Sequence, residues 1–282
     1  MARLLPLVLS YTIARGAGIL AYYVWGGGRQ RCIANMLHVT GGDRRAAQHL
    51  ARCSFSNYGA YLVDFVRLIG ARPEEVQRRV ILEDWERIAA MRTGNGIVFA
   101  TIHFGLWDLG AIALSANGFP VTTIADPFHN PRIDELILGT RKRHGLTIVT
   151  ADRMGPRELR ALKRNQVTAL LIDVPSPEAG IQVEFFGELV AVPDTFARLA
   201  LRAQSPVIAA TLPRIGRWND HARGRVEPVT FEPTGDIERD VRDLTQATFH
   251  TLESQIRDDP AQWYIFRRLW LEPDVEPTGS AA

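Results

Sequence analysis

The chain has 282 residues, a formal net charge of +2 and a hydrophobic fraction of 46%, which are ordinary values for a globular protein. This length suits one large α/β domain or two small ones, and the charge gives no general case for binding nucleic acid. The two cysteines, Cys32 and Cys53, form no CxxC pair. We therefore expect neither a metal site nor a disulfide framework, and a reducing compartment fits the chain.

The segment Leu4–Trp25 is mostly apolar. As a helix it would be about 33 Å long, close to the hydrocarbon thickness of a bilayer. Arg15 lies near its middle, where insertion of an arginine costs roughly 2.5–3.5 kcal/mol. Because no small-residue cleavage site follows, we predict an uncleaved membrane anchor. It either spans the bilayer or lies at its interface, with Arg15 turned to headgroups or to the catalytic domain, and a buried core helix is the alternative.

Several arginines follow this segment closely, namely Arg29, Arg31, Arg44 and Arg45. If the segment spans the bilayer, the positive-inside rule places the bulk of the chain on the cytoplasmic face of the plasma (inner) membrane. The same side chains would be attracted to an anionic leaflet.

A second helical region follows three glycines, Gly26–Gly28, which we expect to break the first helix. A short helix is predicted at Gln30–Leu37 and a long amphipathic one at Asp43–Ile69, with Asp43 as its N-cap. The long helix carries aromatic residues that could line an acyl-chain groove or pack in the core: Phe55, Tyr58, Tyr61 and Phe65.

Beyond residue 79 the patterns of strand and helix alternate, which is typical of a mixed, mainly parallel central sheet flanked by helices. Strands are predicted at Arg79–Leu82, Ile97–Ile102, Pro120–Ala125, Leu146–Val149, Val167–Val174, Gly180–Phe186, Leu189–Val192, Val207–Leu212 and Arg225–Thr230. Helices are predicted at Asp84–Arg92, Leu106–Ala116, Arg132–His144, Pro156–Asn165, Thr195–Ala203 and Ile237–Arg257. We expect an N-terminal membrane-associated helix (1–27), a single domain (28–272) and a disordered tail (273–282).

The stretch Gly96–Asp108 has the features of a reactive site. Its apolar run predicts a buried strand that stops at His103, Gly105 permits a sharp turn, and a helix follows. In open α/β sheets, ligands bind beyond the carboxyl ends of the strands. Asp108 lies in the first helical turn, within reach of the imidazole, and such a pair suits a general base with an orienting carboxylate. A satisfied polar histidine at a strand end is the alternative.

An ordered series of motifs extends this observation over nearly the whole chain. HFGLWD matches H-x4-[DE], and it is preceded by an apolar helix and the segment Asn35–Leu37. It is followed by an Asn-Pro loop, an arginine-bearing helix, a strand ending in Asp173, the segment Val183–Glu188 and the sequence PAQWYIFRRLW. The series resembles the lipid A biosynthesis (lauroyl/myristoyl) acyltransferases, a family that includes the phosphatidylinositol mannoside acyltransferases of actinobacteria. One departure is Leu106, where the family usually carries Asn.

The resemblance implies a glycerolipid acyltransferase-like fold. It also implies transfer of a fatty acyl group from an acyl carrier protein or coenzyme A thioester to a hydroxyl of a glycolipid, of the lipid A precursor or phosphatidylinositol mannoside type. His103 would be the general base, and Asp108 would orient it. We expect no bound cofactor or metal, because the reaction needs only a base and an oxyanion donor, which backbone N–H groups around Gly105 could supply. The expected partners are a membrane glycolipid and the acyl donor.

Four further residues gain roles from the resemblance. Arg141 looks like the family's substrate-binding arginine and would hold a phosphate, although a solvated helix end is the alternative. Arg143, on the same helix, is the next candidate. Asp173 and Glu184 resemble positions where the family carries a further carboxylate, so that either could support His103 or form an ordinary salt bridge.

Other enzyme and binding classes fit the motifs less well. A lysophospholipid or glycerol-phosphate acyltransferase shares the H-x4-D chemistry, but it typically adds an EGTRS-like phosphate segment that this chain lacks. A serine hydrolase would need GxSxG, which is absent. A catalytically silent lipid-binding protein would tolerate the loss of His103 or Asp108, and both residues are present.

Overall fold

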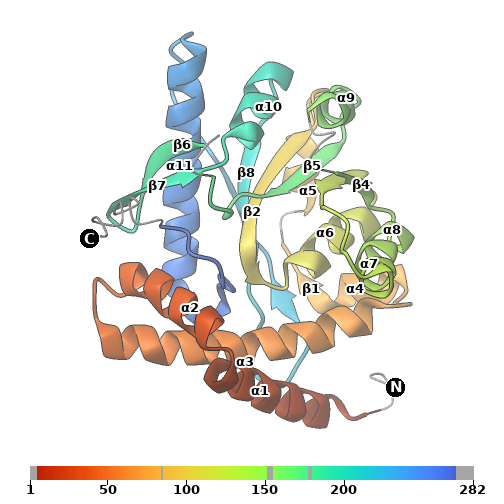
Figure 1. Ribbon diagram of the computed structural model, residues 1–282. Coiled ribbons are helices and arrows are strands. Elements are labelled where there is room, and N and C mark those ends of the chain that lie inside the picture. The colour runs from red at the N-terminus through yellow and green to blue at the C-terminus, as the bar shows by residue number, and fades with distance from the viewer. Residues whose placement is uncertain (1–4, 84, 151–154, 177–179, 271–282) are drawn as a thin grey trace, which may run out of the picture.

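The computed structural model describes residues 5–83, 85–150, 155–176 and 180–270. Its centre is a six-stranded sheet with the strand order β10-β8-β2-β5-β3-β4. All neighbouring pairs are parallel except β10–β8. The prediction of a mixed, mainly parallel sheet is therefore confirmed (Figure 1), and the structure adds that the edge strand β10 is antiparallel. The strands are β2 (Ile97–Gly105), β3 (Val121–Ile124), β4 (Thr147–Val149), β5 (Val167–Leu171), β8 (Val207–Leu212) and β10 (Arg225–Pro228).

The central strand, β2, is buried on both faces, which explains its continuous apolar sequence. Val98, Ala100 and Ile102 belong to one hydrophobic core cluster, and Ile97 and Phe99 to the other. Because side chains alternate along a strand, His103 lies in the same row as Phe99.

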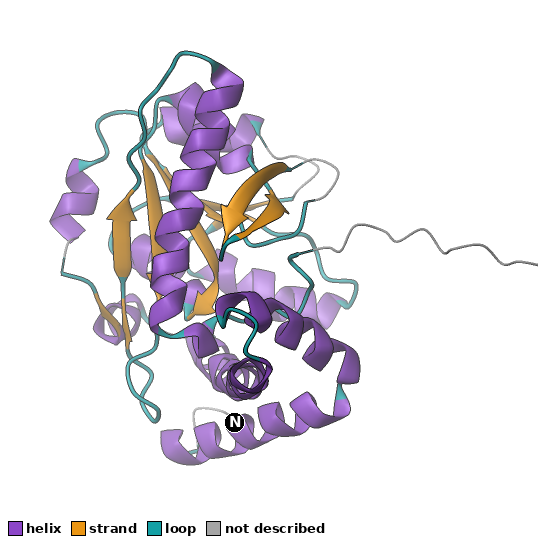
Figure 2. Cartoon of the chain, turned by 90° about the vertical axis from the view of Figure 1, so that its left-hand side faces the viewer, coloured by secondary structure: helices purple, strands orange, loops and turns teal. Residues whose placement is uncertain are grey.

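Helices cover both faces of the sheet. The second cluster joins β2 to α4 (Pro73–Arg79), α5 (Trp85–Ala90) and α6 (Trp107–Ala116). The first joins it to α9 (Pro156–Lys163), α10 (Thr195–Ala203), α11 (Ile237–Asp258) and the hairpin of β6 (Ile181–Phe185) and β7 (Glu188–Val192). Figure 2 shows α11 lying across this face. A short parallel pair, β1 (Val80–Ile81) and β9 (Ala222–Arg223), completes the second side.

Three N-terminal helices lie beyond the carboxyl end of β2 (Figure 1). They are α1 (Leu7–Val24), α2 (Gly26–Val39) and α3 (Arg44–Leu68). Asp43 caps α3 as predicted, since its Oδ1 accepts the N–H groups of Arg45 (2.9 Å) and Ala46 (3.1 Å). The expected break at Gly26–Gly28 is wrong in detail, because the chain turns at Trp25 and the glycines form the first turn of α2.

Two other boundaries differ from those predicted. The strand expected to stop before His103 continues to Gly105, with an irregular register between Thr101 and Gly105. The helix predicted at Arg132–His144 is α7 (Pro131–Asp134), a π-helical turn (Glu135–Gly139) and α8 (Thr140–Arg143) in succession. The predicted tail, 273–282, lies outside the described residues.

Within the described part of the chain, α1 is the helix long and apolar enough to cross a membrane, by length and composition alone. It packs against α3 through two close backbone contacts. A Cβ added at Gly18 would lie 2.2 Å from the Phe55 carbonyl oxygen, and one at Gly59 would lie 2.1 Å from that of Ala14. Only glycine permits this approach of the two helices.

We expect Gly59→Ala to lower the melting temperature, because the added methyl group must push α1 away from α3 at a cost of about 1–3 kcal/mol. The matched control is Gly16→Ala on α1, where an added Cβ meets nothing within 4 Å. Thermal unfolding of both variants is the measurement. Equal melting temperatures would contradict the close seating of α1 on α3.

Candidate active site

The central contact of the site joins His103 and Asp173. Nδ1 of His103 lies 2.8 Å from Oδ1 of Asp173, and the backbone N–H of His103 donates to Oδ2 at 2.9 Å. Asp173 follows β5, the parallel neighbour of β2, so the two carboxyl ends meet at one edge of the sheet. The indole N–H of Trp263 also donates to Oδ2, at 2.9 Å.

The two groups of this pair shift each other's pKa. Burial lowers the pKa of His103, but the charge and hydrogen bond of Asp173 raise it by more, so it lies above its ordinary value. Burial raises the pKa of Asp173, but the charge of His103 and the hydrogen bonds from His103 and Trp263 lower it below its usual range. Asp173 is therefore a carboxylate at neutral pH, and it favours a proton on the imidazole.

The side chain of His103 is 33% exposed, and Nε2 forms no hydrogen bond with any described residue. It faces a cavity of about 680 Å³ that is also lined by Asp173, Arg141 and Arg267. The Arg267 guanidinium is close enough to lower the pKa of His103. A free imidazole nitrogen beside two guanidinium groups suits a reaction on a ligand that also carries negative charge.

We expected Asp108 to orient the imidazole of His103, but the two side chains share no hydrogen bond. Oδ1 of Asp108 accepts from Nε of Arg141 at 2.7 Å, and its Oδ2 accepts from Nη2 of Arg141 at 3.2 Å and from the Tyr61 hydroxyl at 2.5 Å. Both oxygens thus accept from other residues, and the imidazole of His103 donates instead to Asp173. Asp108 acts on His103 only through its charge, which raises the pKa of the imidazole.

Arg141 has the placement expected of a substrate-binding residue, since it lines the cavity and its side chain is only 14% exposed. Burial lowers the pKa of Arg141, but Asp108 raises it by more. The guanidinium therefore stays charged, and the two-pronged contact with Asp108 fixes its plane.

Arg143, Glu184 and Gly105 lie apart from this arrangement. Arg143 pairs with Glu135 at 2.6 Å on the surface, and Glu184 is exposed on β6, so that neither lines the cavity of His103. Gly105 has φ +60°, and an added Cβ would lie 2.1 Å from the Leu212 carbonyl oxygen, so that both the backbone angle and the close approach require glycine. The N–H of Leu106 donates to that same oxygen at 2.8 Å, so it is not available as an oxyanion donor.

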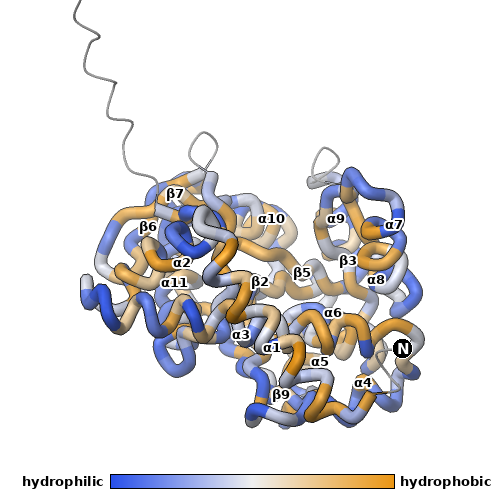
Figure 3. Tube along the Cα trace, turned by 60° about the horizontal axis from the view of Figure 1, so that its bottom comes forward, coloured by the Kyte–Doolittle hydropathy of each residue, from blue (hydrophilic) through white to orange (hydrophobic). Residues whose placement is uncertain are grey.

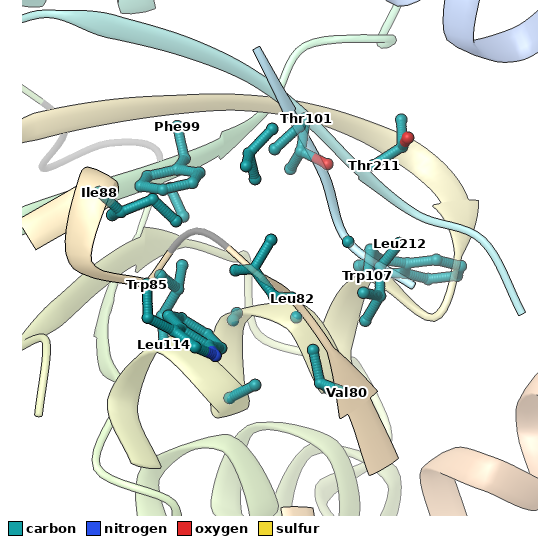
Figure 4. Close-up of a pocket in the computed structure, with 17 residues that line it drawn as sticks. Val80, Leu82, Trp85, Ile88, Phe99, Thr101, Trp107, Leu114, Thr211 and Leu212 are labelled. Carbon is teal, nitrogen blue, oxygen red and sulfur yellow. The ribbon is translucent and has the colours of Figure 1, made fainter. Parts of the chain in front are cut away.

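A second, apolar cavity of about 70 Å³ lies on the same face of β2 as His103 (Figure 4). Phe99 and Thr101, the preceding members of the His103 row, line it together with Gly110 and Trp107. Trp107 separates the two sites, since its ring centroid lies 5.3 Å from that of His103. No charged side chain lines this cavity, which therefore suits a small apolar group such as the end of a hydrocarbon chain.

The C-terminal segment supplies contacts that sequence reasoning missed. Besides the bond from Trp263 to Asp173, the N–H of Tyr264 donates to the His103 carbonyl at 2.8 Å. Asn35 of α2 holds the same segment, donating to the Arg267 carbonyl at 2.6 Å. Trp263, in the sequence PAQWYIFRRLW, is the residue from which this contact could have been predicted, because a buried indole N–H needs an acceptor.

Among the described residues, no group of three or more His, Cys, Asp or Glu side chains is placed to hold a metal ion. The chemistry available at this edge of the sheet is proton transfer at Nε2 of His103 and anion binding by guanidinium groups.

Comparison with known proteins agrees with this geometry. The chain is 26% identical to a phosphatidylinositol mannoside acyltransferase of Mycolicibacterium smegmatis, covering 91% of this chain and 84% of the relative. A protein of the same name from Mycobacterium tuberculosis is 25% identical over 89% and 79%. A lipid A biosynthesis acyltransferase of Haemophilus influenzae is 25% identical over 66% and 58%. The family model for bacterial lipid A biosynthesis acyltransferases matches residues 1–272. The protein is thus an acyltransferase, and it belongs to the bacterial lipid A biosynthesis acyltransferase family.

Proposed function

We propose that the protein is a membrane-associated O-acyltransferase that moves a fatty acyl group from an acyl-coenzyme A or acyl-carrier-protein thioester to a hydroxyl of a glycolipid. The observation that carries the proposal is the His103–Asp173 pair. Its Nδ1 side is fixed by a buried carboxylate, and its Nε2 side is open to a cavity of about 680 Å³. This arrangement suits removal of a proton from a bound hydroxyl.

In the proposed reaction, Nε2 of His103 takes the proton of the acceptor hydroxyl while its oxygen attacks the thioester carbonyl. Asp173 stabilises the imidazolium that forms and keeps the ring in one orientation. The carbon–sulfur bond then breaks, and the leaving thiolate recovers the proton from His103. The acyl group ends as an ester, and the base is regenerated.

The names of the relatives and the positive charge of the cavity both support a phosphate-bearing glycolipid as the acceptor. Two relatives that match most of the chain are named phosphatidylinositol mannoside acyltransferases, and a third is named for lipid A biosynthesis. A phosphatidylinositol mannoside carries a phosphate, and Arg141 with Arg267 would hold such a phosphate beside His103. We place the enzyme at the cytoplasmic face of the inner membrane, where arginines after α1 would meet an anionic leaflet.

The apolar cavity beside Trp107 would accept the tail of the acyl chain. It lies on the same face of β2 as His103, and the Trp107 ring stands between them, so that the acyl chain would have to pass this ring to reach the cavity. Its lining is small at Gly110, where an added Cβ would lie 3.5 Å from Leu212.

The function itself is tested by incubating the protein with radiolabelled acyl-coenzyme A and a lipid extract that contains phosphoglycolipids. A transferase labels a glycolipid, whereas a thioesterase releases only free fatty acid. Appearance of label only in free acid, with both donor types supplied, would overturn the proposal.

Loss of the base should abolish most of the rate. We expect His103→Ala to lower kcat by about 10²–10⁴, the usual value of general acid–base catalysis. We expect the rate of the native enzyme to fall as the pH drops through the raised pKa of His103, because the protonated imidazole cannot accept a proton. Asp173→Asn removes the charge that raises this pKa, so the acid limb should move to lower pH while the maximum rate falls. A His103→Ala enzyme of near native activity would exclude the mechanism.

Asp108 and Arg141 should behave as one unit. Arg141→Lys replaces a two-pronged donor with a point charge and should raise KM. Asp108→Asn should raise KM in the same way, because it releases the guanidinium that Asp108 holds at 2.7 Å. The double variant should lose little more than either single variant, since residues that act together are non-additive. Arg143→Lys is the control, because its side chain pairs with Glu135 at the surface. Purely additive losses would show that the two residues act separately.

Filling the apolar cavity should change chain-length preference. We expect Gly110→Leu to lower kcat/KM for long-chain acyl-coenzyme A by roughly tenfold, the effect of removing about two buried methylene groups. Short-chain donors, whose tails do not reach the cavity, are the internal control. An equal loss for all chain lengths would place the tail elsewhere.

A further inference from the structure

The first helix has its polarity reversed relative to an ordinary surface helix. Its outward face is apolar and uncharged, with Val8, Leu20 and Val24 exposed by 55%, 61% and 72%. Two of its polar residues point inward, where the Tyr11 hydroxyl donates to Asp64 at 2.6 Å and Arg15 donates to Asn57 at 2.6 Å. Figure 3 shows α1 at the front of the molecule, with no part of the chain covering it in that view.

A basic cavity of about 410 Å³ lies along one flank of α1, between α1 and α3. Three arginines line it: Arg15 of α1, Arg52 of α3, and Arg217 from the loop after β8. Arg15 is 7% exposed, and its Nε has no hydrogen-bond partner among the described residues. Ile19 and Tyr23, which belong to the exposed face of α1, form the outer wall.

The positive charge of this cavity is not neutralised within the described chain. None of the three arginines forms an ion pair with a described acidic residue, and the side chain of Arg52 is hydrogen-bonded to that of Tyr23. Burial lowers the pKa of Arg15, and the charges of Arg214 and Arg217 lower it further. Like charges placed together at a half-buried site favour a bound anion.

We propose that this cavity binds the phosphate of an anionic phospholipid, with α1 lying in the plane of the membrane surface. The apolar face of α1 commits the site to a lipid rather than a free anion, because Ile19 and Tyr23 belong to both the cavity wall and that face. Tyrosine is favoured at the level of the headgroups. The site shares no lining residue with the cavity of His103. The inference rests on the membrane association proposed above.

The same contacts argue against a transmembrane α1. A spanning helix would have to release the bonds of Tyr11 and Arg15 to α3, leaving an arginine near the bilayer centre. Alternatively it would carry α3 into the hydrocarbon, together with Arg44, Arg45 and Arg67. Lying flat on α3, α1 keeps its internal contacts and buries only its apolar face in lipid.

The test measures binding of the full chain to vesicles of phosphatidylcholine alone and of phosphatidylcholine with phosphatidylglycerol. The variant carries Arg52→Gln and Arg217→Gln, both at exposed positions. The control carries Arg239→Gln and Arg242→Gln at the beginning of α11, at the end of the molecule opposite α1 (Figure 1). We expect the variant to bind the anionic vesicles roughly tenfold or more weakly, since each basic residue near an anionic surface contributes about 1 kcal/mol. Binding to neutral vesicles should not change, and the control should behave as the native protein.

Two results would overturn the site. Equal losses in the variant and the control would show diffuse attraction, and equal binding of the native protein to the neutral and the anionic vesicles would show that the cavity holds no anionic lipid. Failure of the native protein to bind either vesicle would overturn the membrane association as well. Acyl transfer to a detergent-solubilised acceptor, measured on the same variant, should remain at the native level. A loss of that activity would instead place the two arginines in the catalytic site.

Discussion

The buried carboxylate of Asp173 is the contact on which the rest of the site depends. A carboxylate removed from water must be compensated by hydrogen bonds and opposite charge. Here the compensation comes from three donors, which are the imidazole and backbone N–H of His103 and the indole of Trp263. They belong to β2 and to the C-terminal segment, whereas Asp173 follows β5. One side chain therefore joins the two central strands to a segment from the end of the fold.

The histidine and the carboxylate of the H-x4-D motif contact different partners in this structure. The motif places a histidine and a carboxylate five positions apart, which suggests direct contact. In this protein the carboxylate instead holds Arg141 and Tyr61, whereas Asp173 holds the imidazole. In the proposed mechanism, Asp108 would thus orient the guanidinium that binds an anion, and Asp173 would support the base. The charge of Asp108 still reaches the imidazole and raises its pKa. The motif thus links the reactive histidine to the part of the cavity that would orient a phosphate.

Much of the fold was predictable because its strands are short apolar runs and its long helices have one apolar face. The position of His103 at a carboxyl strand end followed from the same pattern. The family resemblance named Asp173 and Glu184 as possible supports for His103, but local patterns could not choose between them or exclude Asp108. Asp173 meets His103 because β5 lies beside β2, and local patterns do not determine strand order. The extension of β2 to Gly105 depends on a close approach to Leu212, and the role of Trp263 on a contact 90 residues away in the chain. Such long-range contacts leave no periodic signal.

The C-terminal segment is held by residues near the beginning of the chain, so the site is completed late in protein synthesis. Tyr264 and Trp263 close the site from one side, and Asn35 and Ser54, near the beginning of the chain, hold that segment at 2.6 Å and 2.9 Å. A ribosome releases α1 to α3 and β2 long before these last residues emerge. The N-terminal helices therefore emerge while Asp173 still lacks the indole donor, and His103 acquires its full set of neighbours only when translation is nearly complete. If the proposed function holds, the order of synthesis would let α1 reach the membrane before the proposed base is complete.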